Sequence, residues 1–145
     1  YTLCPLMFNG YWQDGQRMLP ELRDGWFSAG DLARRDEEGY IYIVDRKKDM
    51  VVTGGINVYP RQIEELLYRH PAVLECAIIG VPDPRWGERL KGYVVRRPGH
   101  EVTSEELIEL LRPQLSSYKV PREFEFIAEL PRNANGKILK RALHA

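Results

Sequence analysis

The pattern of apolar and polar positions changes near residue 49, and beyond it strand-like and helix-like segments alternate. Three apolar runs predict strands, at residues 73–81, 91–97 and 123–127. The first is apolar along nearly its whole length, which is typical of a strand that is buried on both faces. A shorter run at residues 50–52, followed by two glycines, predicts one further short strand. We therefore expect a mostly three-stranded sheet.

Two segments between these strands have the periodicity of amphipathic helices. The first begins at Pro60, a residue type that favours the first helical position, and ends before Pro71. Its apolar residues follow at helical spacing: Ile63, Leu66 and Leu67. The second opens with the capping box Thr103-x-x-Glu106. Its apolar face contains Leu107, Leu110 and Leu111. A short helix is also expected at residues 138–144, so these elements predict a small α+β domain with helices packed on a sheet.

The N-terminal part has a different character, with many Gly, Asp and aromatic residues and little periodicity. Turn signals recur there, at Asn9-Gly10, Asp14-Gly15 and Asp24-Gly25. Residues 31–44 predict a β-hairpin with its turn at residues 36–39. The charged run at residues 45–49 has the composition of a joint between domains. We therefore divide the chain into residues 1–45, the β-rich end of a larger domain, and residues 46–145, the small α+β domain.

Composition narrows the class of protein. The 145 residues contain 21 Lys and Arg against 21 Asp and Glu, and this balance argues against a general nucleic-acid binder. Cys4 and Cys76 belong to no CxxC or Cys/His cluster, so no metal site is expected, and Cys76 lies in an apolar run that predicts a buried thiol. Reduced cysteines, with no membrane-spanning run and no signal peptide, fit a cytoplasmic protein. Because the chain opens on Tyr1, we expect it to be processed or a fragment.

Three short segments contain residues that could carry chemistry, although each alone is more often structural. Gly54-Gly55 follows a strand and permits either a tight turn or the close approach of a ligand. Lys137 ends a polar loop, and its flexible ammonium can reach a carboxylate or a phosphate. Asp31 opens a strand and could accept hydrogen bonds from sugar hydroxyls. No Ser/His/Asp set is apparent among the three histidines and their neighbours.

The order and spacing of three motifs are more specific than any motif alone. GWFSAGD, DRKKDMVVTGGINVYPRQIE and LPRNANGK resemble the last third of the adenylate-forming (AMP-binding) superfamily, in its acyl-CoA synthetase or fatty-acid–CoA ligase branch. The resemblance implies the mobile C-terminal lid of such an enzyme. It also implies a reaction in two steps. ATP and a carboxylic acid first give an acyl-adenylate and pyrophosphate, and the CoA thiol then attacks to give the thioester and AMP.

The resemblance also implies roles for residues in the first step. Asp31 would hold the ribose hydroxyls of ATP and AMP, and Arg46 would contact the nucleotide near the ribose and phosphate. Lys48 would be the hinge about which the lid rotates between the two steps. Lys137 would bridge the carboxylate of the acid and the α-phosphate during adenylation. Acetylation of Lys137 would remove its charge and is expected to block that step.

For the second step, the resemblance implies that Gly54 and Gly55 enter the site in the rotated pose and line the pantetheine tunnel. Glu64 is expected to have a structural role in supporting the lid strand. Two departures from the family pattern are Ala29, where a polar residue is common, and Ile56, where many relatives have Glu. We expect neither to inactivate the enzyme.

In this family the phosphate loop, the glutamate that holds Mg²⁺ and the acid pocket lie upstream of the lid. The implied cofactors are therefore ATP/AMP, CoA and Mg²⁺, the implied partner is the N-terminal adenylation domain, and this chain alone is expected to be inactive. Fatty acids are the leading substrate class. Two alternatives stay open, transfer to a carrier-protein pantetheine and a non-catalytic lid-like interaction module; no oxygen-handling feature favours a luciferase-like oxygenase. A CoA phosphate patch is less expected than ordinary exposed arginines at Arg85, Arg89, Arg96 and Arg97.

Overall fold

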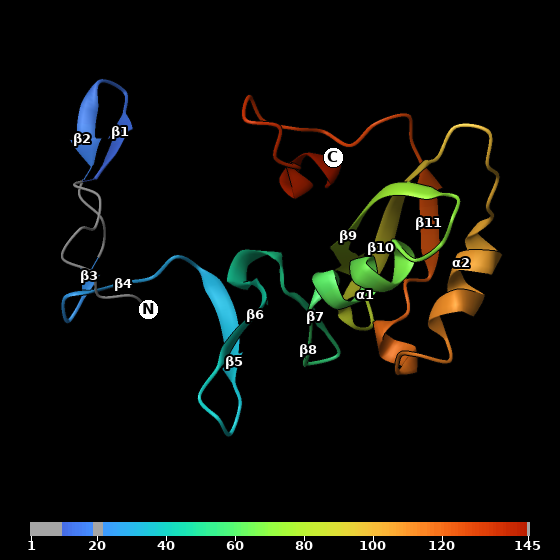
Figure 1. The fold of residues 1–145 in the computed structure, drawn as a ribbon, viewed down its shortest axis with the longest axis horizontal. Coiled ribbons are helices and arrows are strands. Elements are labelled where there is room, and N and C mark those ends of the chain that lie inside the picture. Colours follow the sequence, from blue (N-terminus) through green and yellow to red (C-terminus); the bar gives the residue numbers. More distant parts are fainter. Residues whose placement is uncertain (1–9, 19–21, 145) are drawn as a thin grey trace.

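The computed structural model describes residues 10–18 and 22–144. It consists of three small hairpins followed by a body of one sheet with helices (Figure 1). The hairpin strands are β1 (Tyr11–Gln13), β2 (Gln16–Met18), β3 (Leu22–Arg23), β4 (Trp26–Phe27), β5 (Asp31–Arg35) and β6 (Ile41–Arg46). The division of the chain at residues 45 and 46 stays a prediction.

The first two hairpins turn on Asp-Gly pairs, as their sequence predicts. Asp14 and Gly15 have φ angles of +50° and +76°, and Asp24 and Gly25 have +51° and +80°. Positive φ at both central residues is the geometry of the two-residue turn that matches the twist of the flanking strands. The remaining turn signal includes Asn9, which lies outside the described residues, as does Cys4.

The third hairpin is the one predicted at residues 31–44. Its turn is closed by the Asp36 carboxylate, which accepts a hydrogen bond of 2.9 Å from the Tyr40 amide. Strand β6 continues to Arg46, so that Arg46 lies directly opposite Asp31. The apolar side chains of β6 remain exposed in the described structure: Tyr40, Ile41, Tyr42 and Ile43, the first just before the strand.

The body is built on a five-stranded sheet. Its strands are β7 (Val51–Thr53), β8 (Ile56–Val58), β9 (Val73–Asp83), β10 (Gly87–Arg96) and β11 (Glu123–Phe126). β9 and β10 form a long antiparallel hairpin, and β11 pairs in parallel with β10. The three strands that the apolar runs predict are present as β9, β10 and β11. The additional β7–β8 hairpin joins the sheet through β10.

Two helices cover one face of this sheet (Figure 1). Helix α1 (Pro60–Leu67) begins at Pro60 and buries Ile63, Leu66 and Leu67 as expected. Helix α2 (Ser104–Leu111) begins with the predicted capping box and provides the crossover that parallel pairing of β10 and β11 requires. Gly92 on β10 is needed for this packing, because a Cβ atom there would lie 2.3 Å from the Phe124 ring.

The opposite face of the sheet is covered by the segment after β11. Leu130 and Leu143 pack there against Ala77, Ile79 and Tyr93, and the Tyr93 hydroxyl donates a hydrogen bond of 3.0 Å to the Leu143 carbonyl. The helix expected at residues 138–144 is a 3₁₀ turn, η3 (Lys140–Leu143). Because both faces are covered, β9 needs apolar residues at consecutive positions, which explains its nearly continuous apolar run.

Two further 3₁₀ turns lie within the chain, η1 (Lys47–Asp49) and η2 (Ser117–Lys119).

β11 is an edge strand of the sheet. Its two glutamates, Glu123 and Glu125, form ion pairs with Lys91 on β10 at 3.7 and 2.7 Å, respectively.

Candidate functional site

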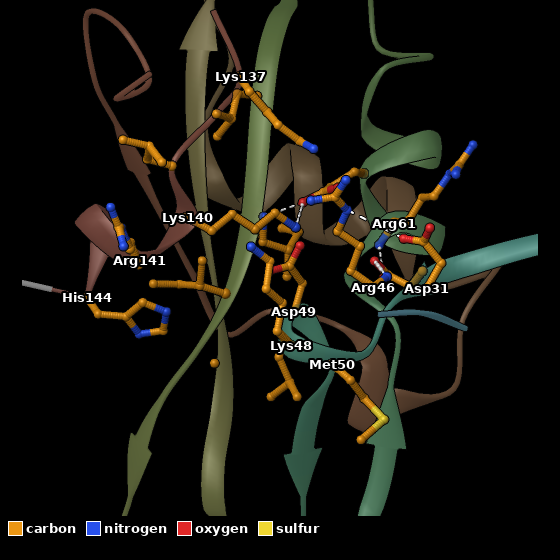
Figure 2. A pocket seen from close by; sticks show the side chains of 18 of the residues that line it. Asp31, Arg46, Lys48, Asp49, Met50, Arg61, Lys137, Lys140, Arg141 and His144 are labelled. Atoms are coloured by element: carbon orange, nitrogen blue, oxygen red, sulfur yellow. Dashed lines mark hydrogen bonds and ion pairs between the residues drawn. The ribbon is translucent and has the colours of Figure 1, made fainter. Parts of the chain in front are cut away.

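A broad groove of about 1200 Å³ lies between the third hairpin and the body. Its walls come from β5, β6 and η1 on one side, and from β9 and the segment at residues 132–144 on the other (Figure 2). Four of the six residues predicted from the resemblance line it: Asp31, Arg46, Lys48 and Lys137. Segments that are far apart in the sequence therefore meet at one surface.

Asp31 and Arg46 form a pair at one side of the groove. They are cross-strand partners on β5 and β6, and the Arg46 Nε lies 3.6 Å from the Asp31 Oδ1. Their side chains are 33% and 40% exposed, respectively, so an ion pair between them contributes little to folding stability. Both side chains are accessible to a ligand in the groove.

Asp45 is a buried carboxylate beside this pair that the sequence motifs did not single out. It is 7% exposed. Its Oδ1 accepts a hydrogen bond of 2.7 Å from the Arg46 amide, and its Oδ2 accepts one of 3.0 Å from the Arg61 amide in the first turn of α1. Asp45 therefore connects the third hairpin to the N-terminus of α1, where a negative charge is favourable.

Lys48 lies in the middle of η1, the single 3₁₀ turn that joins β6 to β7. The residues on either side of η1, Arg46 and Met50, are both extended. The Lys48 side chain is exposed and has no ion pair or hydrogen bond within the described part of the chain. A short turn between extended residues, with an unattached side chain, is a suitable place for a change of backbone angles.

Lys137 extends from a tight polar loop into the groove. Its side chain points toward the side that carries Asp31 and Arg46 (Figure 2). The loop is closed by Asn133, whose backbone amide donates to the Lys137 carbonyl at 2.9 Å, and whose Oδ1 accepts from the Lys137 amide at 2.9 Å. Among the described residues, the Lys137 ammonium has no ion-pair partner.

Lys140, three residues after Lys137 and at the start of η3, has a different role. Its Nζ lies 2.6 Å from the Glu64 Oε1, and both side chains are less than one-fifth exposed. The same Glu64 oxygen accepts a hydrogen bond of 2.8 Å from the Ile78 amide on β9. Glu64 thus links α1, β9 and η3, which confirms the structural role expected for it. Lys140 was not singled out, because one Lys in a basic C-terminal segment carries no local signal of its distant partner.

The glycine pair lies away from the groove, at the turn between β7 and β8. Gly54 and Gly55 have φ angles of +58° and +79°. The Gly54 amide donates a hydrogen bond of 2.8 Å to the Trp86 carbonyl, and a Cβ on Gly54 would lie 2.9 Å from the Trp86 ring. A Cβ on Gly55 would meet nothing. The structure therefore does not bring the glycine pair together with Lys137.

The four arginines considered for a CoA phosphate do not form a common patch. Arg89 pairs with Glu123 at 3.2 Å. Arg96 donates to the Val102 carbonyl and lies over the Phe126 ring, and Arg97 donates to the carbonyls of residues 71 and 73. Arg85 lies over the Trp86 ring. Most of these guanidinium groups therefore hold the fold together.

Cys76 is a buried thiol of β9 that faces α1, and its burial agrees with the prediction. Burial, followed by the negative charge of Glu64, raises the pKa of the Cys76 thiol to about 12. A thiol of this kind is neutral and unreactive near neutral pH. Within residues 10–18 and 22–144 there is no group of three or more His, Cys, Asp or Glu side chains that could hold a metal ion. No helix in this part of the chain has the length and apolar character to cross a membrane.

Comparison with known proteins gives one consistent result. The family model of the AMP-binding enzyme C-terminal domain matches residues 62–137. A long-chain-fatty-acid–CoA ligase of Bacillus subtilis (strain 168) is 48% identical over 139 residues, which are 96% of this chain and 25% of that protein. The fatty acid–[acyl-carrier-protein] ligase ScoC of Streptomyces coeruleorubidus is 45% identical over 139 residues, again 96% of this chain and 27% of that protein.

Among solved structures, ATP-bound MatB from Rhodopseudomonas palustris matches with a TM-score of 0.78 and 42% identity, over 83% of this chain and 24% of that one. The chain thus spans about a quarter of the length of the relatives that it matches. The family model covers more than half of the chain, and it includes most of α1, the strands β9 to β11, α2 and the Lys137 loop. The chain therefore belongs to the AMP-binding enzyme C-terminal domain family.

Proposed function

We propose that this chain is the C-terminal part of an acid–thiol ligase that activates a carboxylic acid with ATP and transfers the acyl group to CoA. The observation that carries the proposal is the groove in which Lys137 faces the Asp31–Arg46 pair. A carboxylate beside a guanidinium suits a ribose with an adjacent phosphate, and the exposed ammonium of Lys137 on the opposite wall suits a second anion. A non-catalytic interaction module has no need of all three groups.

In the adenylation step, Asp31 accepts hydrogen bonds from the two ribose hydroxyls, because an ionised carboxylate has several acceptor positions. Arg46 contacts the nucleotide near the ribose and phosphate. Lys137 stabilises the negative charge that develops between the carboxylate of the acid and the α-phosphate in the transition state. The Lys137 side chain is exposed and has no ion pair with any described residue, and this supports the role, since no competing ion pair within residues 10–18 and 22–144 has to be broken.

In the thioester step, the lid turns about Lys48 and brings Gly54 and Gly55 to the reacting centre. The open space around Gly55 supports a role in admitting the pantetheine arm, because a side chain there would obstruct the path of the thiol. The position of the glycine pair outside the groove supports the use of two different faces of the lid.

The rest of the active site belongs to the larger part of the enzyme. The chain spans about a quarter of its relatives, and we assign the phosphate loop, the Mg²⁺ ligand and the acid pocket to the remaining part. The exposed apolar side chains at residues 40–43 of the third hairpin support this assignment, because exposed apolar side chains that lie close together normally pack against other protein. The 145 residues alone are therefore expected to be inactive, and fatty acids are the leading substrate class.

The test is thioester formation by the full-length protein that contains this chain, with ATP, Mg²⁺, CoA and a panel of short, long and aromatic acids. The wild type is expected to form an acid-dependent thioester. Lys137→Ala should slow adenylation by roughly 100-fold or more, the usual cost of removing a transition-state charge partner. When preformed acyl-adenylate is supplied, the variant should form thioester at nearly the wild-type rate. Equal adenylation rates in the two proteins would remove Lys137 from the mechanism.

Transfer to a carrier protein is the second candidate. The similarity to ScoC, at 45% identity, favours it nearly as much as the 48% identity to the CoA ligase favours CoA. A phosphopantetheine arm on a carrier protein presents the same thiol as CoA, so the lid residues do not separate the two. Adding either CoA or a pantetheinylated carrier protein to the enzyme with its adenylate distinguishes them. If thioester forms only on the carrier protein and not on CoA, the acceptor is the carrier protein.

A further inference from the structure

The loop that presents Lys137 has no anchor of its own in the core. Leu130 before it is 2% exposed and packs on the sheet, but most residues from 132 to 137 are exposed. An exposed loop with little apolar contact is held in shape mainly by polar contacts, and such segments belong to the least stable parts of a fold. The position of the Lys137 ammonium therefore depends on the polar contacts of this loop.

Arg132 makes two of these contacts with one guanidinium. Its Nη1 donates a hydrogen bond of 2.6 Å to the Gly136 carbonyl, in the peptide unit that leads directly into Lys137. Its Nη2 forms an ion pair with Glu75 in β9. A planar guanidinium holds both partners at fixed angles, which a single ammonium cannot do. Arg132 thus connects the tip of the loop to the longest strand of the sheet.

Glu75 is suited to be the fixed end of this connection. It lies near the start of β9, opposite Val95 of β10, and β9 and β10 pair along nearly their whole lengths. Its side chain is 29% exposed, and Arg132 is its ion-pair partner in the described structure. A partly exposed ion pair of this kind contributes little to global stability. Its effect is therefore expected on the position of the loop rather than on the folding of the domain.

We propose that Arg132 and Glu75 are positioning residues for Lys137. The Glu75 carboxylate orients the Arg132 guanidinium, which holds the Gly136 carbonyl and so directs Lys137 into the groove. This inference rests on the proposed role of Lys137 in adenylation. Glu75 acts only through Arg132, and neither side chain touches the reacting atoms.

The test uses the full-length enzyme with Arg132→Ala, Glu75→Gln and the double variant. A displacement of about 1 Å can cost on the order of 100-fold in rate, so both single variants should lower kcat for adenylation by roughly 10- to 100-fold. KM for ATP should stay nearly constant, because Asp31 and Arg46 are untouched. Thioester formation from preformed acyl-adenylate should also be unchanged.

The double variant separates positioning from independent effects. If Glu75 acts through Arg132, the double variant should be no slower than Arg132→Ala alone, since coupled residues are not additive. Additive losses would overturn the proposal. Glu125→Gln is the matched control, because it removes a comparable ion pair, that with Lys91 at 2.7 Å, away from the loop. An equal loss of adenylation in this control would also overturn it.

A second readout does not depend on activity. The Lys137 amide is hydrogen bonded to Asn133 in the closed loop, so its hydrogen exchange reports on the loop. Arg132→Ala and Glu75→Gln should raise exchange at residues 135–138 while α1 keeps its protection. Unchanged exchange would overturn the positioning role. Faster exchange in both variants, with adenylation unaffected even by Lys137→Ala, would instead contradict the proposed function and leave the loop contact in place.

Discussion

Gly54 occupies a position at which any other residue would be strained. Its φ angle of +58° lies in the left-handed region, and the Trp86 ring leaves no room for a Cβ atom, which would approach to 2.9 Å. Gly55 next to it shares the positive φ but has open space around it. The two neighbours therefore separate backbone strain from steric contact.

Gly54→Ala is expected to destabilise the fold more than Gly55→Ala. Both substitutions should cost about 1–2 kcal/mol for the left-handed backbone. Only the first adds the clash with Trp86, which Trp86→Ala should relieve in a double variant. Denaturant unfolding at neutral pH measures the difference, and equal free energies of unfolding for the two single variants would refute the steric argument.

Cys76 should make the free energy of unfolding depend on pH in the alkaline range. The pKa of the thiol is about 12 in the fold against 9.0 as the reference value, so the folded protein holds its proton where the unfolded chain has lost it. Stability is then fully present below about pH 9 and falls as pH rises toward 12, by at most about 1.4 kcal/mol per pH unit. Burial also raises the pKa of Tyr68, which adds in the same direction above about pH 10.

Urea unfolding of the wild type and of Cys76→Ala between about pH 8 and pH 10 checks this expectation, because the thiol is the first of the two groups to titrate. Below about pH 9 the variant is expected to be less stable than the wild type, because a buried side chain is shortened. The informative quantity is therefore the slope with pH. A slope that is the same in both proteins would show that Cys76 does not contribute.

At the scale of elements, the contact between the third hairpin and α1 depends on one buried side chain. Asp45 precedes η1 in the chain, whereas the Arg61 amide that it accepts from follows η1. A rotation within η1 would separate the two groups. The Asp45 contact therefore depends on the backbone angles that η1 has in this structure.

Asp45→Asn should loosen this contact. An amide places an NH₂ group where one of the two backbone donors now finds an oxygen, and an unsatisfied buried group costs about 1–3 kcal/mol. Hydrogen exchange in the first turn of α1 should rise, together with a lower free energy of unfolding. Glu65→Gln on the same helix breaks only the exposed pair with Arg61 and is expected to cost less than about 0.5 kcal/mol. Equal effects would argue against a special role for Asp45.

At the scale of the whole molecule, the sequence predicts those elements that depend on residues close together in the chain. The helices at residues 60–67 and 104–111 follow from their periodicity and from a proline and a capping box, and the Asp-Gly turns follow from backbone preference. Of the small β7–β8 hairpin, the sequence predicts only the first strand, because three-residue strands carry almost no periodic signal.

The groove could be predicted only in part, through family motifs that mark Asp31, Arg46, Lys48 and Lys137. The contacts that hold the groove in shape could not be predicted. Asp45 with Arg61, Glu64 with Lys140 and Arg132 with Glu75 each join segments that are distant in sequence. No periodicity or turn preference connects such partners, so only the folded chain shows them.

The edge strand β11 affects how readily the protein aggregates in a concentrated solution. A strand with one unpaired side is a template on which another molecule can add a strand and begin to aggregate. The two glutamates of β11 bring charge to that edge, and their lysine partner keeps them in place. A domain with such charges along its edge can in this way expose an open sheet border to water without adhering to its neighbours.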